Sequence, residues 1–314
     1  MSNGQIYRKT FVFSWIRFLI DLIGVLALVG CIIAGYFIDG KRHYIGVLVG
    51  LVIGIVIFIV IISFVSYMYK AAQIAMMMRG VTENKLPEHL VSAGKQEVKE
   101  HFSTIFVYFA VTGAIKGIFN EISAGINALG NVAGGTTGGE VADTVTSIAN
   151  TIIAYLCDCC LGWVFYRKGV SAWKSTCEGA VLFFKNWKTL LKNLGRIFGI
   201  GILSFIIIGG IFGVGYYFLF KQFPDFTNYI ITALKHSSSN LKNITDPTVA
   251  TMVVAGLFAI ITWSILHAAF VRPFVLVGVL RNYMEAGIKA TPTEDDMKEL
   301  DGKFKKFNKI HAKA

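Results

Sequence analysis

The sequence contains few charged residues for its length. Asp, Glu, Lys and Arg make up 16% of the 314 residues, whereas soluble domains contain about 25%. Apolar residues reach 54%, and the mean hydropathy is +0.61. Proline is also scarce, with only five residues, which favours long uninterrupted helices. These deficits argue against a soluble globular domain and predict an all-α integral membrane protein.

Sequence motifs that carry enzymatic chemistry are absent. The chain has no Walker motif, no nucleophile elbow, no HExxH zinc motif and no recognisable pair of catalytic carboxylates. We therefore expect no enzymatic activity, no catalytic residues, no metal site and no cofactor. Three of the five cysteines cluster at Cys157, Cys159 and Cys160. We interpret them as small residues in helix packing, because a zinc or redox centre would need further ligands.

Six apolar stretches approach or exceed the length that a helix needs to cross a bilayer, about 20 residues. We therefore predict a polytopic protein with about six transmembrane helices in a single domain, residues 1–286, followed by a basic tail, residues 287–314. The predicted spans are Phe11–Phe37, Tyr44–Tyr69, Phe102–Phe119, Ser147–Tyr166, Leu194–Phe220 and Val249–Val271.

Lys and Arg are distributed unevenly between the loops. Of the 30 basic residues, 22 lie before the first span, after the second and fourth spans, or after the sixth span, and only five lie in the other loops. Cytoplasmic loops carry an excess of basic residues, so both termini are predicted to face the cytoplasm or its topological equivalent. The net charge of +11 thus reflects membrane topology and not nucleic-acid binding.

Amphipathic helices are predicted on the cytoplasmic face after the second, fourth and sixth spans. In residues 168–193, aromatic and apolar side chains recur at helical spacing and lysines occupy the opposite face, which is typical of a helix lying in the membrane interface. The alternative is that these segments simply extend the spans. The tail lysines either bind anionic headgroups, at about 1 kcal/mol each, or are solvated.

Asp158 and a set of aromatic residues are the candidates for a substrate-binding site. Asp158 lies near the middle of the fourth predicted span, where a carboxylate needs a partner, a cavity or a cation. Together with Tyr155, Trp163, Trp263 and His267, it would suit a cage for a small organic cation. Interfacial aromatic belts and helix packing explain the same residues without a ligand.

Other charged residues lie inside or beside the predicted spans. Arg17 and Asp21 are four residues apart on one face of the first span, so we predict a structural intramembrane ion pair. Lys116 and Glu121 end the third span, and the predicted topology places them at the outer interface, where their side chains can reach water.

A cytoplasmic segment of the chain resembles part of a known family. The sequence KGVSAWKSTCEGAVLFFKN is similar to the segment that precedes a late span in choline transporter-like proteins. The resemblance extends over roughly residues 163–286, although members of that family are longer and have more spans. The residues that carry the motif are Gly169, Ser175, Leu182, Lys185 and Asn186.

The resemblance implies transport of choline or a related organic cation. We therefore expect a transporter-like protein for a small cationic or amphiphilic solute. The alternative is a non-catalytic structural or assembly subunit of a larger membrane complex that interacts with lipids. The expected partners are membrane lipids, including anionic headgroups, with a small organic cation, further copies of the chain or other membrane subunits as additional candidates.

Overall fold

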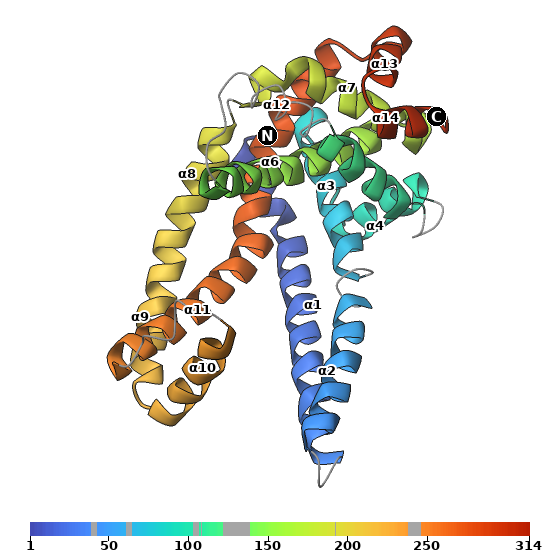
Figure 1. Cartoon of the computed structure of the whole chain (residues 1–314). Helices are drawn as coiled ribbons and strands as arrows, with labels where there is room; N and C mark the ends of the chain where they lie inside the picture. Colours follow the sequence, from blue (N-terminus) through green and yellow to red (C-terminus); the bar gives the residue numbers. More distant parts are fainter. Residues whose placement is uncertain are drawn as a thin grey trace. The chain divides into compact units, whose positions relative to one another are not determined.

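The chain folds into helices that form two compact units (Figure 1). Our computed structural model describes residues 1–38, 43–60, 65–102, 107, 109–121, 139–191, 193–237 and 246–314. Unit 1 comprises Met1–Leu194 and Pro273–Ala314, and unit 2 comprises Gly195–Arg272. Within the described residues all regular structure is helical, as predicted. The tail belongs to unit 1, so the predicted boundary at residue 287 does not separate the two units.

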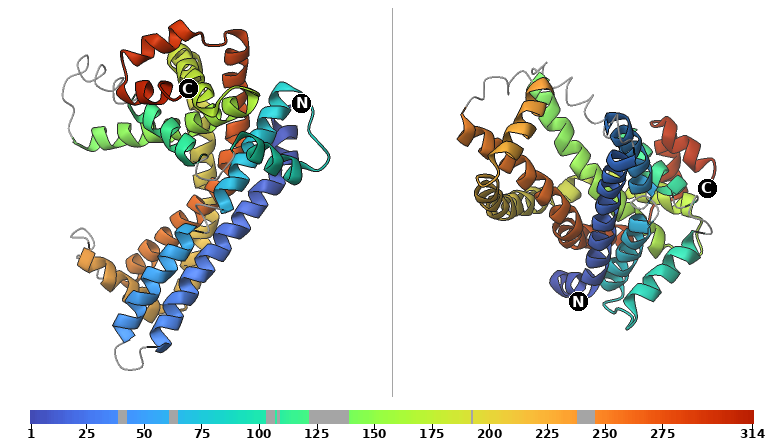
Figure 2. Two further views of the ribbon diagram at one scale, coloured as in Figure 1. Left: turned by 90° about the vertical axis from the view of Figure 1, so that its right-hand side faces the viewer. Right: turned by 90° about the horizontal axis from the view of Figure 1, so that it is seen from below.

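Unit 1 begins with a helical hairpin. α1 (Asn3–Ile38) and α2 (His43–Val60) run side by side (Figures 1 and 2). The N-terminal part of α1 packs on α3, and the rest of the hairpin extends away from the other helices of the unit. Glycines recur every fourth residue on α2, and a Cβ on Gly50 would collide with the carbonyl oxygen of Cys31 on α1. A Cβ on Gly54 would lie 2.7 Å from Cδ1 of Leu28. Glycine spacing of this kind lets membrane helices approach closely enough for backbone packing.

The hairpin leaves large apolar side chains exposed. Leu26 on α1 is 62% exposed, and Val52 on α2 is 61% exposed. Many other Leu, Ile and Val side chains of both helices are exposed as well. Soluble monomers rarely present a continuous apolar surface of this extent to water. We infer that lipid, and not water, surrounds α1 and α2.

Three helices are long and apolar enough to cross a membrane: Asn3–Ile38, Gly195–Phe220 and Pro247–Lys289. They coincide with the first, fifth and sixth predicted spans. Two shorter apolar helices, Leu48–Val60 and Asn150–Tyr166, fall within the second and fourth. The protein is therefore helical and embedded in a membrane, as predicted, while the total of six crossings stays a prediction.

The remaining described helices of unit 1 pack into what we call the helical body. Figures 1 and 2 show that α6 runs across the direction of the α1–α2 hairpin and not alongside it. The body consists of helical residues 109–121, α3 (Tyr67–Thr82), α4 (Leu90–His101), α6 (Gly139–Tyr166), α7 (Ala172–Leu191), α12 (Arg272–Lys289), α13 (Glu294–Asp301) and α14 (Lys305–His311).

The methionine-rich helix α3 is the core of the body. Eight consecutive residues, from Ala71 to Met78, are each no more than 2% exposed. Packing against α1, α4 and α6 covers them. An amphipathic helix in the membrane interface was predicted after the second span. α3 follows that span, and because protein buries it on every side over two turns, it has no free face that could contact the membrane interface.

Unit 2 contains the fifth and sixth predicted spans. Its first long helix is interrupted by a π-helical turn, η2, and its second ends in another, η4. Aromatic rings join the two, since the hydroxyl of Tyr216 lies 2.9 Å from that of Thr262 and the ring of Phe258 packs on Tyr216. The elements are α8 (Leu194–Ser204), η2 (Phe205–Gly209), α9 (Gly210–Phe220), α10 (Pro224–Ser237), α11 (Pro247–Leu266) and η4 (His267–Val271).

The hairpin packing can be tested with one substitution at two positions. Alanine normally stabilises a helix relative to glycine by about 1 kcal/mol, but Gly50→Ala forces a Cβ against the α1 backbone. We expect Gly50→Ala to lower stability by about 1–3 kcal/mol, measured by thermal unfolding in detergent micelles. The matched control is Gly30→Ala, because a Cβ there meets no atom within 4 Å. Equal melting temperatures for the two variants would contradict the packing.

Candidate functional site

Buried carboxylates of the helical body are each paired with a basic side chain. Glu97 on α4, Asp158 on α6 and Glu178 on α7 have side chains that are 6%, 6% and 2% exposed. Removing a carboxylate from water costs several kcal/mol unless a partner with good geometry compensates. The basic partners are more exposed than the carboxylates, so negative charge points inward and positive charge outward.

Asp158 forms an ion pair with Lys70 of α3. The ammonium nitrogen lies 2.6 Å from Oδ1 of Asp158 and 5.8 Å from the ring centroid of Tyr67. The sequence left open whether Asp158 faces a partner, a cavity or a cation. In the structure its partner is a cation from the chain itself. The two residues are 88 positions apart, so sequence spacing gave no signal for the pair.

Trp163 belongs to a second buried network around Glu178. Its indole Nε1 donates a hydrogen bond of 3.0 Å to Oε2 of Glu178. Arg167 donates two hydrogen bonds to the same carboxylate, of 2.7 and 2.9 Å. These bonds raise the pKa of the Arg167 guanidinium above its usual value. A bidentate pair of this kind fixes the direction of both side chains, so Trp163 is positioned by a contact between α6 and α7.

The five predicted substrate-binding residues fall into two groups. Asp158, Trp163 and Tyr155, which is buried, belong to unit 1. Trp263 and His267 belong to unit 2.

In unit 2 the Trp263 indole donates a 3.1 Å hydrogen bond to the Ser204 hydroxyl. The ring centroids of Trp263 and His267 are 5.2 Å apart. Both π-helical turns adjoin this cluster, since Ser204 precedes η2 and His267 begins η4. Helix packing accounts for these contacts.

Arg17 and Asp21 take part in a larger polar network between α1 and α3. Arg17 donates a 3.3 Å hydrogen bond to Gln73, which in turn donates one of 3.0 Å to the Ser14 hydroxyl. Arg17 also interacts electrostatically with Asp21, whose carboxylate is hydrogen-bonded to Ser66. Sequence reasoning missed Gln73. The available signal was a single glutamine in an otherwise apolar, methionine-rich run.

The residues of the family-like motif have structural roles. Gly169 has φ of +79° at the turn between α6 and α7, a left-handed conformation that favours glycine. Ser175 is fully buried. Lys185 forms an ion pair with Asp296 of α13, and Asn186 donates a 3.1 Å hydrogen bond to the Leu182 carbonyl.

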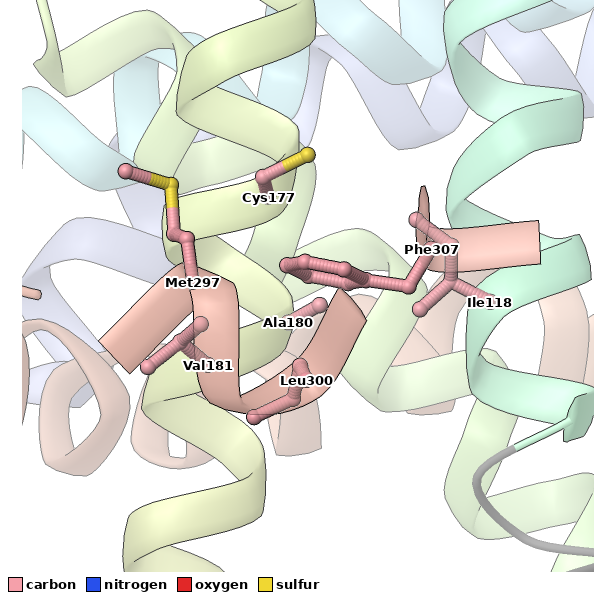
Figure 3. Packing of buried hydrophobic residues seen from close by; sticks show 7 residues of the cluster. All are labelled: Ile118, Cys177, Ala180, Val181, Met297, Leu300 and Phe307. Atoms are coloured by element: carbon pink, nitrogen blue, oxygen red, sulfur yellow. The ribbon is translucent and has the colours of Figure 1, made fainter. Parts of the chain in front are cut away.

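The C-terminal helices α13 and α14 pack on α7 and on helical residues 109–121, and are not solvated as a free tail. Lys174 and Lys185 of α7 pair with Glu294 and Asp296 of α13. An apolar cluster lies between these elements (Figure 3), and burial raises the pKa of the Cys177 thiol to about 12. The cluster consists of Ile118, Cys177, Ala180, Val181, Met297, Leu300 and Phe307.

A second contact fixes the start of α14. The carboxylate of Glu121 accepts hydrogen bonds from the backbone N–H groups of Lys305 and Lys306, at 3.0 and 2.7 Å. These groups begin a helix and lack intrahelical acceptors, so a carboxylate satisfies them well. Helical residues 109–121 and the tail are therefore joined by both polar and apolar contacts.

Among the described residues, no three His, Cys, Asp or Glu side chains are grouped in a way that would hold a metal ion. Comparisons of the chain with protein-family models, with curated proteins and with solved structures found no match. The resemblance to choline transporter-like proteins therefore rests on the sequence motif alone.

The docking of α13 predicts a pH dependence. Hydrogen bonds from Lys174 and Lys185 lower the pKa of Glu294 and Asp296, respectively. Each carboxylate thus has a lower pKa when docked than when free. Docking is fully favoured above the usual carboxylate range, about pH 4, and weakens as the pH falls through the lowered values.

We expect hydrogen exchange in α13, corrected for its intrinsic pH dependence, to be slow near neutral pH and faster below about pH 4. In the double variant Lys174→Gln/Lys185→Gln, exchange should already be faster at neutral pH and should change less on acidification. Equal protection of α13 in both proteins at every pH would show that the ion pairs do not hold it.

Proposed function

We propose that this chain is a non-enzymatic membrane protein of the structural or assembly class, whose helical body lies at the cytoplasmic leaflet and binds anionic lipid headgroups. The proposal depends on the arrangement of charge in the body. Its buried carboxylates point inward, whereas the tail lysines Lys305, Lys306 and Lys309 are exposed. A surface of this kind attracts anionic headgroups, and salt screens the attraction.

Two observations support a cytoplasmic location for both termini. The distribution of Lys and Arg favours it by the positive-inside rule. Arg281 of α12 also donates hydrogen bonds of 2.7 Å to the Asn3 side chain and to the Met1 carbonyl. This contact holds the N-terminus against the helix from which the C-terminal segment continues. An N-terminus and a C-terminal segment joined in this way lie on one side of the bilayer.

Lipid binding can be measured on the intact chain in nanodiscs. We expect the melting temperature to be higher in a phosphatidylcholine–phosphatidylglycerol mixture than in phosphatidylcholine alone, and the difference to shrink with added salt. The exposed tail lysines Lys305, Lys306 and Lys309 should contribute about 1 kcal/mol each. Replacing all three with Gln should remove most of the difference.

The matched control is Lys221→Gln, an exposed lysine that the charge distribution assigns to the opposite face. It should leave the lipid effect unchanged. A wild-type protein that melts at the same temperature in both lipid compositions would refute lipid binding by the body.

A second candidate function is the handling of a small cationic solute such as choline. One specific observation favours it, because the carboxylate of Asp158 already holds an alkylammonium group beside a tyrosine ring. Carboxylate charge and an aromatic face are the groups that recognise organic ammonium ions. A solute would have to take the place of the Lys70 ammonium.

This second function requires a variant that removes the Asp158 charge without disrupting the fold. Asp158→Asn alone leaves the Lys70 ammonium without this carboxylate, so we expect a stability loss of about 3–5 kcal/mol. The double variant Lys70→Gln/Asp158→Asn removes both charges and should regain much of the wild-type abundance. If Asp158 binds the solute, this double variant is inserted normally but takes up no choline. Uptake at the wild-type rate by the double variant would exclude Asp158 from transport.

A further inference from the structure

We propose that helical residues 109–121 and α6 do not cross the membrane but stay on the face that carries the C-terminal helices. The chain would then cross the bilayer four times, through α1, α2 and the two long helices of unit 2. This inference goes beyond the proposed function and does not depend on lipid binding. It concerns which side of the membrane the buried ion pairs face.

The Glu121 contact is the first observation. Six crossings would place the C-terminal end of the third span at the outer interface, with the tail on the cytoplasmic side. The bilayer core that separates these two locations is about 30 Å thick. Glu121 nevertheless accepts hydrogen bonds of 3.0 and 2.7 Å from the backbone N–H groups of Lys305 and Lys306. Glu121 and the start of α14 therefore lie on the same side of the membrane.

Apolar packing at the same place is the second, independent observation. Ile118 is fully buried in the cluster that includes Phe307 of the tail (Figure 3). One residue further, the ring of Phe119 packs on Phe183 of α7 with centroids 5.2 Å apart. Both α7 and the tail lie in segments that the charge distribution assigns to the cytoplasm. The end of this helix is therefore anchored to two cytoplasmic elements.

The burial and direction of α6 agree with this placement. Its residues from Leu156 to Phe165 are almost all buried, because α3 and α7 pack against it. α1 and α2, by contrast, leave large apolar side chains exposed, as expected for helices in contact with lipid. α6 also runs across the hairpin direction (Figures 1 and 2). Protein therefore covers almost all of the apolar residues within 156–165 of α6.

The positive-inside rule does not distinguish four crossings from six. The stretch 120–146, which follows the third predicted span, contains no Lys or Arg. Moving this stretch from one side of the membrane to the other therefore does not change the number of Lys and Arg residues on either side. Four crossings and six crossings also both place the two termini on the same side, because each number is even. Four crossings also remove the cost of placing Asp158 in the middle of the hydrocarbon. Its ion pair with Lys70 then lies at the cytoplasmic end of the hairpin.

Cysteine labelling in cells tests this placement. The test uses Asn120→Cys, at an exposed position, in the full chain with its native cysteines retained. A membrane-impermeant maleimide is applied before and after permeabilisation, and the unsubstituted chain gives the background. Lys309→Cys reports the side of the tail, and Gln222→Cys reports the loop after the fifth span; both positions are exposed.

We expect Asn120→Cys to react under the same condition as Lys309→Cys, and Gln222→Cys to react under the opposite one. Lys116→Cys, an exposed position one helical turn earlier, should repeat the result for Asn120. If Asn120→Cys instead reacts together with Gln222→Cys, the helix crosses the membrane and the inference is overturned. Lipid binding does not enter this measurement, so the two proposals can fail separately.

Discussion

Lipid must cover the helices that the chain leaves apolar and exposed, and this requirement shapes the rest of the protein. Water around α1, α2, α8, α9 and α11 would face long runs of Leu, Ile, Val and Phe side chains. Helices satisfy their own backbone hydrogen bonds, so they can enter hydrocarbon without unpaired N–H and C=O groups. Within lipid, burial of apolar side chains no longer drives association, and close contact through small residues replaces it. The glycine contacts between α2 and α1 are an example.

Apart from Arg8, Lys9, Arg17 and Asp21 on α1, the charged residues that the structure describes in unit 1 lie on the helices and connections of the helical body. Buried carboxylates are costly unless paired, and Asp158, Glu97 and Glu178 each pair with a Lys or Arg from another segment. These pairs join α3, α4, α6 and α7. Because the basic partners lie nearer the surface, each of these pairs presents its positive end outward. The internal order of the body and its proposed lipid binding thus have one physical origin.

The sequence predicted correctly what depends on local composition. Long apolar runs identified the helices at residues 3–38, 195–220 and 247–271, and the apolar excess identified a membrane protein. Local composition does not tell whether an apolar run is covered by lipid or by protein, because both environments select the same residues. Residues 156–165 of α6 and the pair Ile118 and Phe119 illustrate this, since contacts from distant segments of the chain bury almost all of them.

The candidate site was less predictable than the fold, for the same reason. Asp158 was singled out correctly as a charge that needs a partner, but Lys70 lies on a helix 88 residues earlier and no local pattern connects them. In the tail, Met297 and Leu300 are three residues apart and both are buried; this apolar spacing among the lysines indicates a docked helix face. The hydrogen bonds from the indole N–H groups of Trp163 and Trp263 to Glu178 and Ser204 also join residues distant in the sequence, while ligand contact by the two rings stays a prediction.

Spin labels on the hairpin provide the most direct test that lipid covers it. Nitroxides would be placed at Leu26 and Val52, and at the exposed Lys298 as a reference, in protein reconstituted into vesicles. The collision rates of each nitroxide with oxygen and with a water-soluble nickel complex would then be compared. We expect high oxygen and low nickel accessibility at Leu26 and Val52, with the reverse at Lys298. High nickel accessibility at Leu26 and Val52 would place the hairpin in water and contradict the account.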